Sequence, residues 1–482
     1  MKKLVLINPH PQEHLGEENI SVLVQMPLNL GYIAALTPKD WEIDVIDECI
    51  ETAIDGKTGD ITFDPTGVKL VGVTAVSYQA PRAYDIARAC KRRRIPVVIG
   101  GPHASTLPDE VAAYADAAIV GEAEGVWADV IRDAEKGQLK NQYFGGLTPL
   151  NKLRDVYPDR GLLKKKYGYR YSSIITTRGC PNRCDFCAVP VFQGRKYRER
   201  PVEDVLAEMQ ATDYKGLMFA EDNFYGHSKI SNDRAKELFR KMTERNVVKD
   251  WFGFTALNTT SDEECLKYMA SSGCLGILIG IESLDEDVLK SMNKRVNIRM
   301  GVEGYRKGIE NLHRHGIICW GSVIFGTDGD KKDNFKRMTD FALDMGMDVL
   351  TFGIYTPMPM TESFHRMTKQ GRVFRNNFPE DWFYYNSNHL VFALKDMPLE
   401  DFIEGMEYVY ENLYSREALK KRFDKTLRET NNSKNAMFAY RINIDWRVVF
   451  KSVIDDLKKL YDSDVYTGVK SNRVLISGGK VE

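Results

Sequence analysis

Residues 173–190, SIITTRGCPNRCDFCAVP, place Cys180, Cys184 and Cys187 directly after a short apolar run. This run is the first of six with strand character, and a helical pattern separates each one from the next. The six runs are SIITT, GLMFAED, WFGFTAL, GILIGIE, CWGSVIFG and VLTFGIYTP. Strands that alternate with helices predict a parallel sheet, and six repeats are too few for a complete eight-stranded barrel. We therefore expect an open, partial (β/α)6 barrel of the TIM type over residues 171–370.

A second α/β unit is expected over residues 1–150. Its strand-like runs are KLVLINP, EIDVIDE, KLVGVTAVS, PVVIGG and AAIVGE. They predict a Rossmann-like, doubly wound parallel sheet, whose ligand crevice lies beyond the carboxyl ends of the strands. From about residue 140 the pattern lapses into a Gly-, Pro- and Lys-rich stretch, and we expect a linker at 151–170. Residues 371–482 predict a small, mostly helical domain, with amphipathic helices at 401–414 and 445–461.

The composition is that of an ordinary globular protein. Of the 482 residues 43% are hydrophobic and 28% charged, and the net charge is -1, so the chain has no general attraction to nucleic acid. The basic run at 194–200, GRKYRER, is interpreted as a solvated face or a carboxylate-clamping loop. No apolar stretch approaches the roughly 18 residues of a membrane span, and the first apolar run is too short for a signal peptide. We expect a cytoplasmic protein with reduced thiols.

Three cysteines this close together indicate a metal centre. Structural zinc almost always has four ligands, and no histidine lies between Arg178 and Gly226, so His227 would have to complete a zinc site from a distance. A redox disulfide would need a thioredoxin-like context, which is absent. A four-iron cluster suits three cysteines on one tight loop and leaves one iron without a protein ligand. The sequence favours the cluster, with zinc as the alternative.

With Phe186 before the last cysteine, this loop resembles the radical S-adenosylmethionine signature C-x3-C-x-aromatic-C. Three later segments resemble the same family: AEDNF at 220–224, IGIESLDEDVLKSMNK at 279–294 and GSVIFGTDGD at 321–330. The resemblance implies a [4Fe-4S] cluster on Cys180, Cys184 and Cys187. It further implies contacts to S-adenosylmethionine from Phe186, Asp222, Asn223, Glu282 and Ser322.

The first unit resembles the cobalamin-binding domain fused to one class of these enzymes, in which G-G-x-H is followed by G-E-x-E. The matching residues are Gly100, Gly101, His103, Ala104, Gly121, Glu122 and Glu124. The loops NPHP at 8–11 and SYQ at 77–79 add Pro9, His10, Ser77, Tyr78 and Gln79 to the expected cobalamin contacts. Because D-x-H-x-x-G is absent, we expect no histidine below the cobalt, and Tyr78 or Gln79 is the candidate catalytic neighbour of the metal.

These resemblances imply a cobalamin-dependent radical S-adenosylmethionine C-methyltransferase. It would move a methyl group from methylcobalamin to an unactivated carbon through a 5'-deoxyadenosyl radical. A peptide or protein side chain, or a soluble small molecule, is slightly favoured as substrate over a lipid or tetrapyrrole. A flavodoxin- or ferredoxin-type protein would supply electrons. The alternatives are a cobalamin-dependent cyclase or rearrangement enzyme and, in another class, a non-catalytic cobalamin sensor.

One segment departs from the family pattern P-x-P-G-T. This chain has Pro357-Met358-Pro359-Met360-Thr361, with methionine in place of a glycine that would make a tight turn. We therefore expect its substrate-side loop to differ from that of close relatives.

Overall fold

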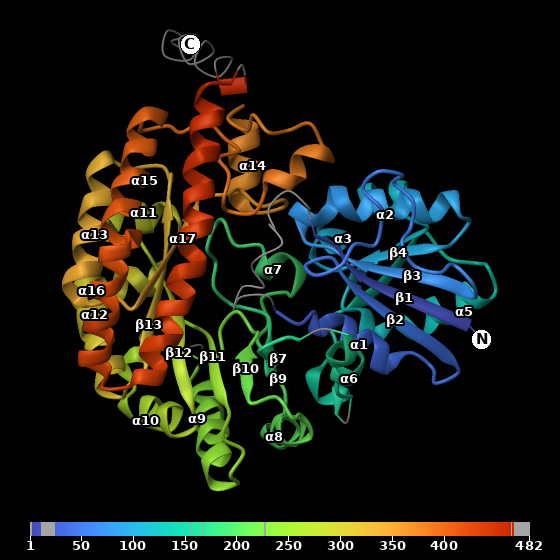
Figure 1. The fold of residues 1–482 in the computed structure, drawn as a ribbon, viewed down its shortest axis with the longest axis horizontal. Coiled ribbons are helices and arrows are strands. Elements are labelled where there is room, and N and C mark those ends of the chain that lie inside the picture. Colours follow the sequence, from blue (N-terminus) through green and yellow to red (C-terminus); the bar gives the residue numbers. More distant parts are fainter. Residues whose placement is uncertain are drawn as a thin grey trace.

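The computed structural model describes residues 2–10, 25–154, 156–166, 168–225, 228–463 and 465–466. Two six-stranded parallel sheets organise these residues and lie side by side (Figure 1). No helix among the described residues is long and apolar enough to cross a membrane.

The first sheet has the order β2-β1-β3-β4-β5-β6, so the chain reverses direction across the sheet between β1 and β3. Its strands are β1 (Lys2–Asn8), β2 (Trp41–Asp47), β3 (Val68–Thr74), β4 (Val97–Gly100), β5 (Ala117–Gly121) and β6 (Gln142–Gly146). Its helices are α1 (Leu28–Leu36), α2 (Ala80–Arg92), α3 (Pro102–Thr106), α4 (Pro108–Tyr114) and α5 (Trp127–Glu135). The expected doubly wound, Rossmann-like sheet is confirmed.

The second sheet has the order β14-β13-β12-β11-β10-β7, and its two edge strands do not pair with each other. Its strands are β7 (Ser172–Ile174), β10 (Gly216–Phe219), β11 (Asp250–Thr255), β12 (Cys274–Glu282), β13 (Ile318–Phe325) and β14 (Val349–Ile354). The helices along it are α8 (Val202–Ala211), α9 (Lys229–Glu244), α10 (Glu263–Ser271), α11 (Glu286–Ser291), α12 (Arg295–Arg314) and α13 (Lys332–Met345). All six predicted strands are present, and the partial, open barrel is confirmed.

The stretch between the two sheets is more regular than its composition predicts. β6 pairs in parallel with β5, within the stretch where the sequence shows no strand or helix pattern. The expected linker at 151–170 contains α6 (Arg160–Lys166). Because Gly145 and Gly146 are typical of turns, the sequence of β6 resembles a loop.

The C-terminal helices pack on the barrel. They are α14 (Glu362–Lys369), α15 (Leu399–Tyr414), α16 (Arg416–Thr430) and α17 (Ser433–Tyr461), and α15 and α17 contain the two predicted amphipathic segments. Phe438, Ala439 and Ile442 of α17 form one buried apolar cluster with strand residues such as Ile318 and Trp320. In Figure 1 α17 runs across β12 and β13. It therefore covers the inner face of the barrel near the amino ends of the strands.

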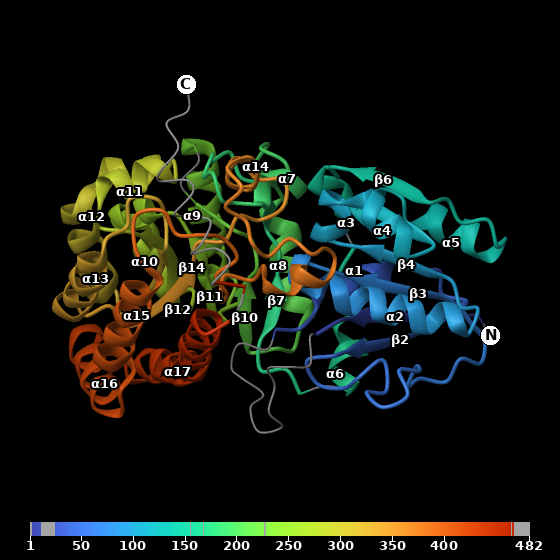
Figure 2. The same ribbon diagram turned by 90° about the horizontal axis from the view of Figure 1, so that it is seen from above.

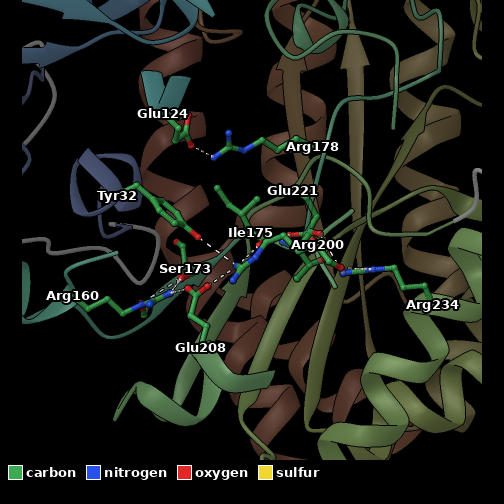
Figure 3. A network of polar contacts seen from close by, with 12 residues as sticks. Tyr32, Glu124, Arg160, Ser173, Ile175, Arg178, Arg200, Glu208, Glu221 and Arg234 are labelled. Carbon is green, nitrogen blue, oxygen red and sulfur yellow. Dashed lines mark hydrogen bonds and ion pairs between the residues drawn. The ribbon is translucent and has the colours of Figure 1, made fainter. Parts of the chain in front are cut away.

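A buried ion network joins the barrel to the first sheet's helices (Figure 3). Glu208 of α8 is fully buried and forms ion pairs with Arg160 of α6 and with Arg200, the residue that follows β9 (Arg198–Glu199). Arg200 also lies 3.5 Å from the hydroxyl of Tyr32 on α1. Charges removed from water in this way are stable only when each one is compensated.

Replacing Glu208 with glutamine should therefore destabilise the fold. The change leaves Arg160 and Arg200 buried without a carboxylate, at a cost of about 3 kcal/mol or more. Urea denaturation followed by circular dichroism measures the loss. Glu203→Gln on the same helix is the matched control, because Glu203 is exposed and pairs with Arg245 at the surface. Equal midpoints for the two variants would contradict the importance of the buried network.

Candidate functional site

The three cysteines lie on a loop closed at its base by two short strands. β8 (Thr177–Arg178) and β9 (Arg198–Glu199) pair antiparallel, and the loop between them carries the cysteines and α7 (Val189–Phe192). Gly179 begins the loop with φ of +86°, and a Cβ there would lie 2.3 Å from the carbonyl oxygen of Lys196. A glycine is thus required where the chain turns into the first cysteine.

The far side of the loop is anchored across the barrel mouth. The Asp185 carboxylate accepts hydrogen bonds from Tyr355 Oη at 2.8 Å and Arg366 Nη2 at 2.9 Å. The Asn293 side chain donates to the Arg183 carbonyl at 2.6 Å. These contacts come from the residue after β14, from α14 and from the segment before α12, so three separate parts of the chain fix the position of the loop.

All three cysteines line one cavity of about 470 Å³. The sequence-predicted residues Phe186, Asp222, Asn223, Glu282 and Ser322 line the same cavity. Among the described residues, no three His, Cys, Asp or Glu side chains converge on one point where a single ion would bind. A four-iron cluster needs no such convergence, because each cysteine binds a different iron. The zinc alternative rested partly on His227, which lies outside the described residues.

Glu282 is the most constrained polar side chain of this cavity. It follows a register shift in β12, has φ of +62° and is buried. Its Oε1 accepts from Lys294 Nζ at 2.6 Å, whereas its Oε2 is buried with no hydrogen-bond partner among the described residues. Burial opposes the charged form of Lys294, but Glu282 outweighs it and raises the pKa of this amine. Such an unsatisfied oxygen indicates a place for a hydrogen-bond donor from a ligand.

Asp222 and Asn223 act differently in the same cavity. Asp222 is exposed to the cavity, where desolvation raises its pKa to about 6. Asn223 Oδ1 accepts from the backbone N–H groups of Tyr225 and Ala256, at 3.2 and 3.0 Å. Asn223 therefore also holds the loop after β10 in place, a role that the sequence did not reveal.

A second cavity, of about 260 Å³, lies at the carboxyl edge of the first sheet. Its lining includes the predicted Gly100, Gly101, Gly121, Glu122 and Glu124, and apolar side chains from β1, β3, β4 and β5. Ile175, Arg178, Phe192 and Gln193 close it from the barrel side. Figure 2 shows α7 between the two halves. Val189 and Pro190 of α7 line the cysteine cavity and Phe192 lines this glycine-lined crevice, so the two cavities lie on either side of one short helix.

Arg178 lines the crevice and pairs with two glutamates of the first unit. It lies 3.1 Å from Glu122 and 2.6 Å from Glu124, and the latter contact is drawn in Figure 3. Arg198 binds Glu122 through both carboxylate oxygens, at 2.9 and 2.6 Å. The G-E-x-E glutamates thus bind arginines of the barrel, and the interpretation of residues 194–200 as a carboxylate-clamping loop is confirmed. Sequence reasoning missed Arg178 and Lys294, although both lie within the quoted motifs.

Seven predicted cobalamin contacts do not line the crevice: Pro9, His10, Ser77, Tyr78, Gln79, His103 and Ala104. His103 is fully buried, 3.0 Å from Tyr84 Oη and 3.2 Å from Glu110, which also accepts from Trp382 Nε1. Gln79 Nε2 donates to the Pro9 carbonyl at 2.7 Å, and its Oε1 accepts from Val76 N. The side chains of His103 and Gln79 therefore form hydrogen bonds to other residues of the protein and hold the loops after β4 and β3 in place. Tyr78 is partly exposed on the same loop, and burial raises its pKa to about 12.

The loop after β14 carries Met360 at the position where the family pattern has glycine. Met360 has φ of +63°, in the left-handed region that glycine adopts most easily, and is 46% exposed. The next residue, Thr361, caps α14 by accepting from Phe364 N at 3.2 Å. The tight turn is therefore formed with methionine in place of glycine.

Comparison with known proteins finds two matching families. Residues 174–342 match the radical SAM superfamily and residues 22–131 match the B12 binding domain. The chain is 31% identical over 433 residues to the bacteriochlorophyllide d C-12(1)-methyltransferase of Chlorobaculum tepidum, covering 87% of this chain and 89% of that protein. It is 30% identical to the C-8(2)-methyltransferase of the same organism, covering 75% and 79%.

Among solved structures, the fold is similar to that of TsrM, a radical S-adenosylmethionine methyltransferase from Kitasatospora setae. The TM-score is 0.65 at 15% identity, and the match covers 95% of this chain and 100% of that one. At this identity the likeness concerns the fold alone.

A buried acid beside the cysteine loop should make stability depend on pH. Glu221 accepts hydrogen bonds from Thr176, and burial raises its pKa from 4.5 to about 7. The folded protein then holds this proton more tightly than the unfolded chain does, so stability falls as pH rises between these values. Glu221→Gln removes the effect, and its stability relative to the original should rise by up to about 3 kcal/mol between pH 5 and pH 8.

Urea denaturation at the two pH values measures this change. Glu203→Gln is the control, because Lys241 and Arg245 lower the pKa of Glu203 and the variant should show no gain at pH 8. A Glu221→Gln advantage that does not grow with pH would contradict the assignment.

Proposed function

Because this chain belongs to the family of cobalamin-dependent radical S-adenosylmethionine methyltransferases, we propose that it methylates an unactivated carbon of a tetrapyrrole. As a member of this family it is an enzyme with a [4Fe-4S] cluster, S-adenosylmethionine and cobalamin as cofactors. When bound, the cluster and S-adenosylmethionine supply the radical chemistry that activates a C–H bond, and cobalamin supplies the methyl group.

We assign the cluster to Cys180, Cys184 and Cys187 and S-adenosylmethionine to the adjoining part of the same cavity. The partnerless Oε2 of Glu282 fits an ammonium or hydroxyl donor of that cofactor. Asp222 offers a second carboxylate to the same cavity. Lys294 holds Glu282 in place, and Asp185 holds the loop that carries Phe186.

We assign cobalamin to the glycine-lined crevice. A side chain on Gly100 has room there, since among the described residues, its chain neighbours aside, only Ile119 Cβ, at 3.6 Å, lies within 4 Å of a Cβ at that position. Apolar walls and a position at the carboxyl ends of parallel strands are typical of such cofactor sites. Tyr78 remains our candidate neighbour of the cobalt, whereas the hydrogen bonds of Gln79 favour a loop-holding role.

The substrate proposal rests on one observation: 30–31% identity over most of the chain to two enzymes named for bacteriochlorophyllide d. Apolar residues of the cysteine cavity, including Phe254, Leu257 and Leu278, support a flat apolar substrate. A tetrapyrrole therefore replaces the peptide side chain as our first choice. We further propose a cytoplasmic enzyme that receives electrons from a flavodoxin- or ferredoxin-type protein.

Glu282→Gln should weaken S-adenosylmethionine binding by about tenfold or more, because a hydrogen bond to a charged group is lost. Isothermal titration calorimetry of the anaerobically reconstituted protein measures the affinity. Glu286→Gln on α11 is the control, because Glu286 is exposed and pairs with Lys290. Unchanged affinity in Glu282→Gln would remove Glu282 from the cofactor site.

Methyl transfer is tested with the enzyme reconstituted with iron, sulfide and cobalamin, and incubated with S-adenosylmethionine, dithionite and bacteriochlorophyllide d. We expect 5'-deoxyadenosine and a pigment heavier by one methylene group in the mass spectrum, and neither product from Cys184→Ala. Deoxyadenosine without any change to the pigment would contradict the tetrapyrrole proposal and leave the family chemistry intact.

A further inference from the structure

Three exposed arginines line the cysteine cavity. Arg183 lies in the cysteine loop itself, and Arg295 and Arg299 lie at the start of α12. All three are exposed and all three line the cavity. We call Arg183, Arg295 and Arg299 the arginine rim.

The rim carries positive charge that the protein does not compensate. Among the described residues, none of its guanidinium groups lies within ion-pair distance of a carboxylate. Two acids line the same cavity: Glu282 already binds Lys294 at 2.6 Å, and Asp222 is a single carboxylate against three arginines. The cavity mouth is therefore cationic.

The rim is also held together by the fold. Asn293, itself at φ of +57°, donates to the Arg183 carbonyl at 2.6 Å and accepts from Arg295 Nε at 3.0 Å. A break in α12 at Gly301, with φ of +62°, separates residues 295–300 from the rest of the helix. One asparagine thus ties the cysteine loop to the segment that carries the other two arginines.

The exposure of the rim indicates the size of its partner. A small anion is bound best by buried, bidentate arginines, whereas clustered, exposed cations act mainly by steering a large anionic surface into place. Electron transfer slows steeply with distance, so a redox protein must dock where the cysteine loop lies at the surface. Pro181 of that loop is exposed next to Arg183 of the rim.

We infer that the arginine rim is the docking surface for the acidic protein that reduces this enzyme. This inference rests on the electron donor in the proposed function. One electron leaves the reduced flavin or iron–sulfur centre of the donor, which is oxidised by one electron, and the enzyme's cluster gains that electron. No other reactant is needed for this step.

The test compares two reductants on the reconstituted enzyme with S-adenosylmethionine. The double variant Arg295→Glu/Arg299→Glu should bind a flavodoxin about tenfold more weakly in biolayer interferometry. The ratio of its 5'-deoxyadenosine formation rate with reduced flavodoxin to its rate with dithionite should fall by about the same factor. In the original enzyme, binding and the flavodoxin-driven rate should weaken as salt is added.

Arg416→Glu/Arg428→Glu is the matched control, because both arginines are exposed on α16, away from the cysteine loop, and the net charge changes equally (Figure 1). The milder Arg295→Gln/Arg299→Gln serves if the charge-reversed protein fails to fold, and cluster absorbance per chain checks each preparation.

Three outcomes overturn the inference. An equal fall in the rate of 5'-deoxyadenosine formation with both reductants would assign the rim to cofactor binding. An unchanged rate with both reductants would show that the donor does not dock there and would favour an acidic substrate as the partner of the rim. If dithionite reduces the original enzyme but neither flavodoxin nor ferredoxin does, the proposed donor class is wrong, and the proposed docking surface is wrong as well.

Discussion

The pairing of Glu122 with Arg178 and Arg198 is the interaction on which the arrangement of the site depends. Glu122 follows the last residue of β5 at the edge of the glycine-lined crevice, and Arg178 lies two residues before the first cysteine. These charges are largely buried, so separating them would leave each uncompensated in a poorly solvated seam. Neither sheet can slide along the other without breaking the pairs. These ion pairs therefore fix the position of the first sheet relative to the barrel, and with it the distance between the two cavities.

Most of the fold could be predicted because parallel strands are buried on both faces and appear as unbroken apolar runs. GILIGIE and CWGSVIFG are such runs, and both are central strands of the barrel. β6 was not predicted, because an edge strand with one buried residue, Tyr143, and two glycines has almost no run of apolar residues. The cover that α17 gives the barrel interior was equally hidden, since an amphipathic pattern indicates a buried face but not what buries it.

The site could be predicted where function demands a fixed spacing along the chain, and less well where it depends on pairing across the fold. The cysteine loop, Asp222 and Glu282 lie in recognisable segments and share one cavity. The partners of Glu122 lie 56 and 76 residues further along the chain, beyond the reach of any local pattern. His103 and Gln79 show that a residue in a recognisable position need not face the site. Both follow strands of the first sheet, yet their side chains form hydrogen bonds to other residues of the protein.

The backbone at Met360 has a consequence for how this enzyme can vary. A side chain at φ of +63° costs on the order of 1 kcal/mol, and branching at Cβ would raise that cost further. Substitution by glycine or asparagine is sterically easy, whereas valine, isoleucine and threonine are excluded. Diversification of this turn is thus confined to a narrow set of residues, whereas neighbouring positions with φ outside the left-handed region, such as Met358, accept a wider set.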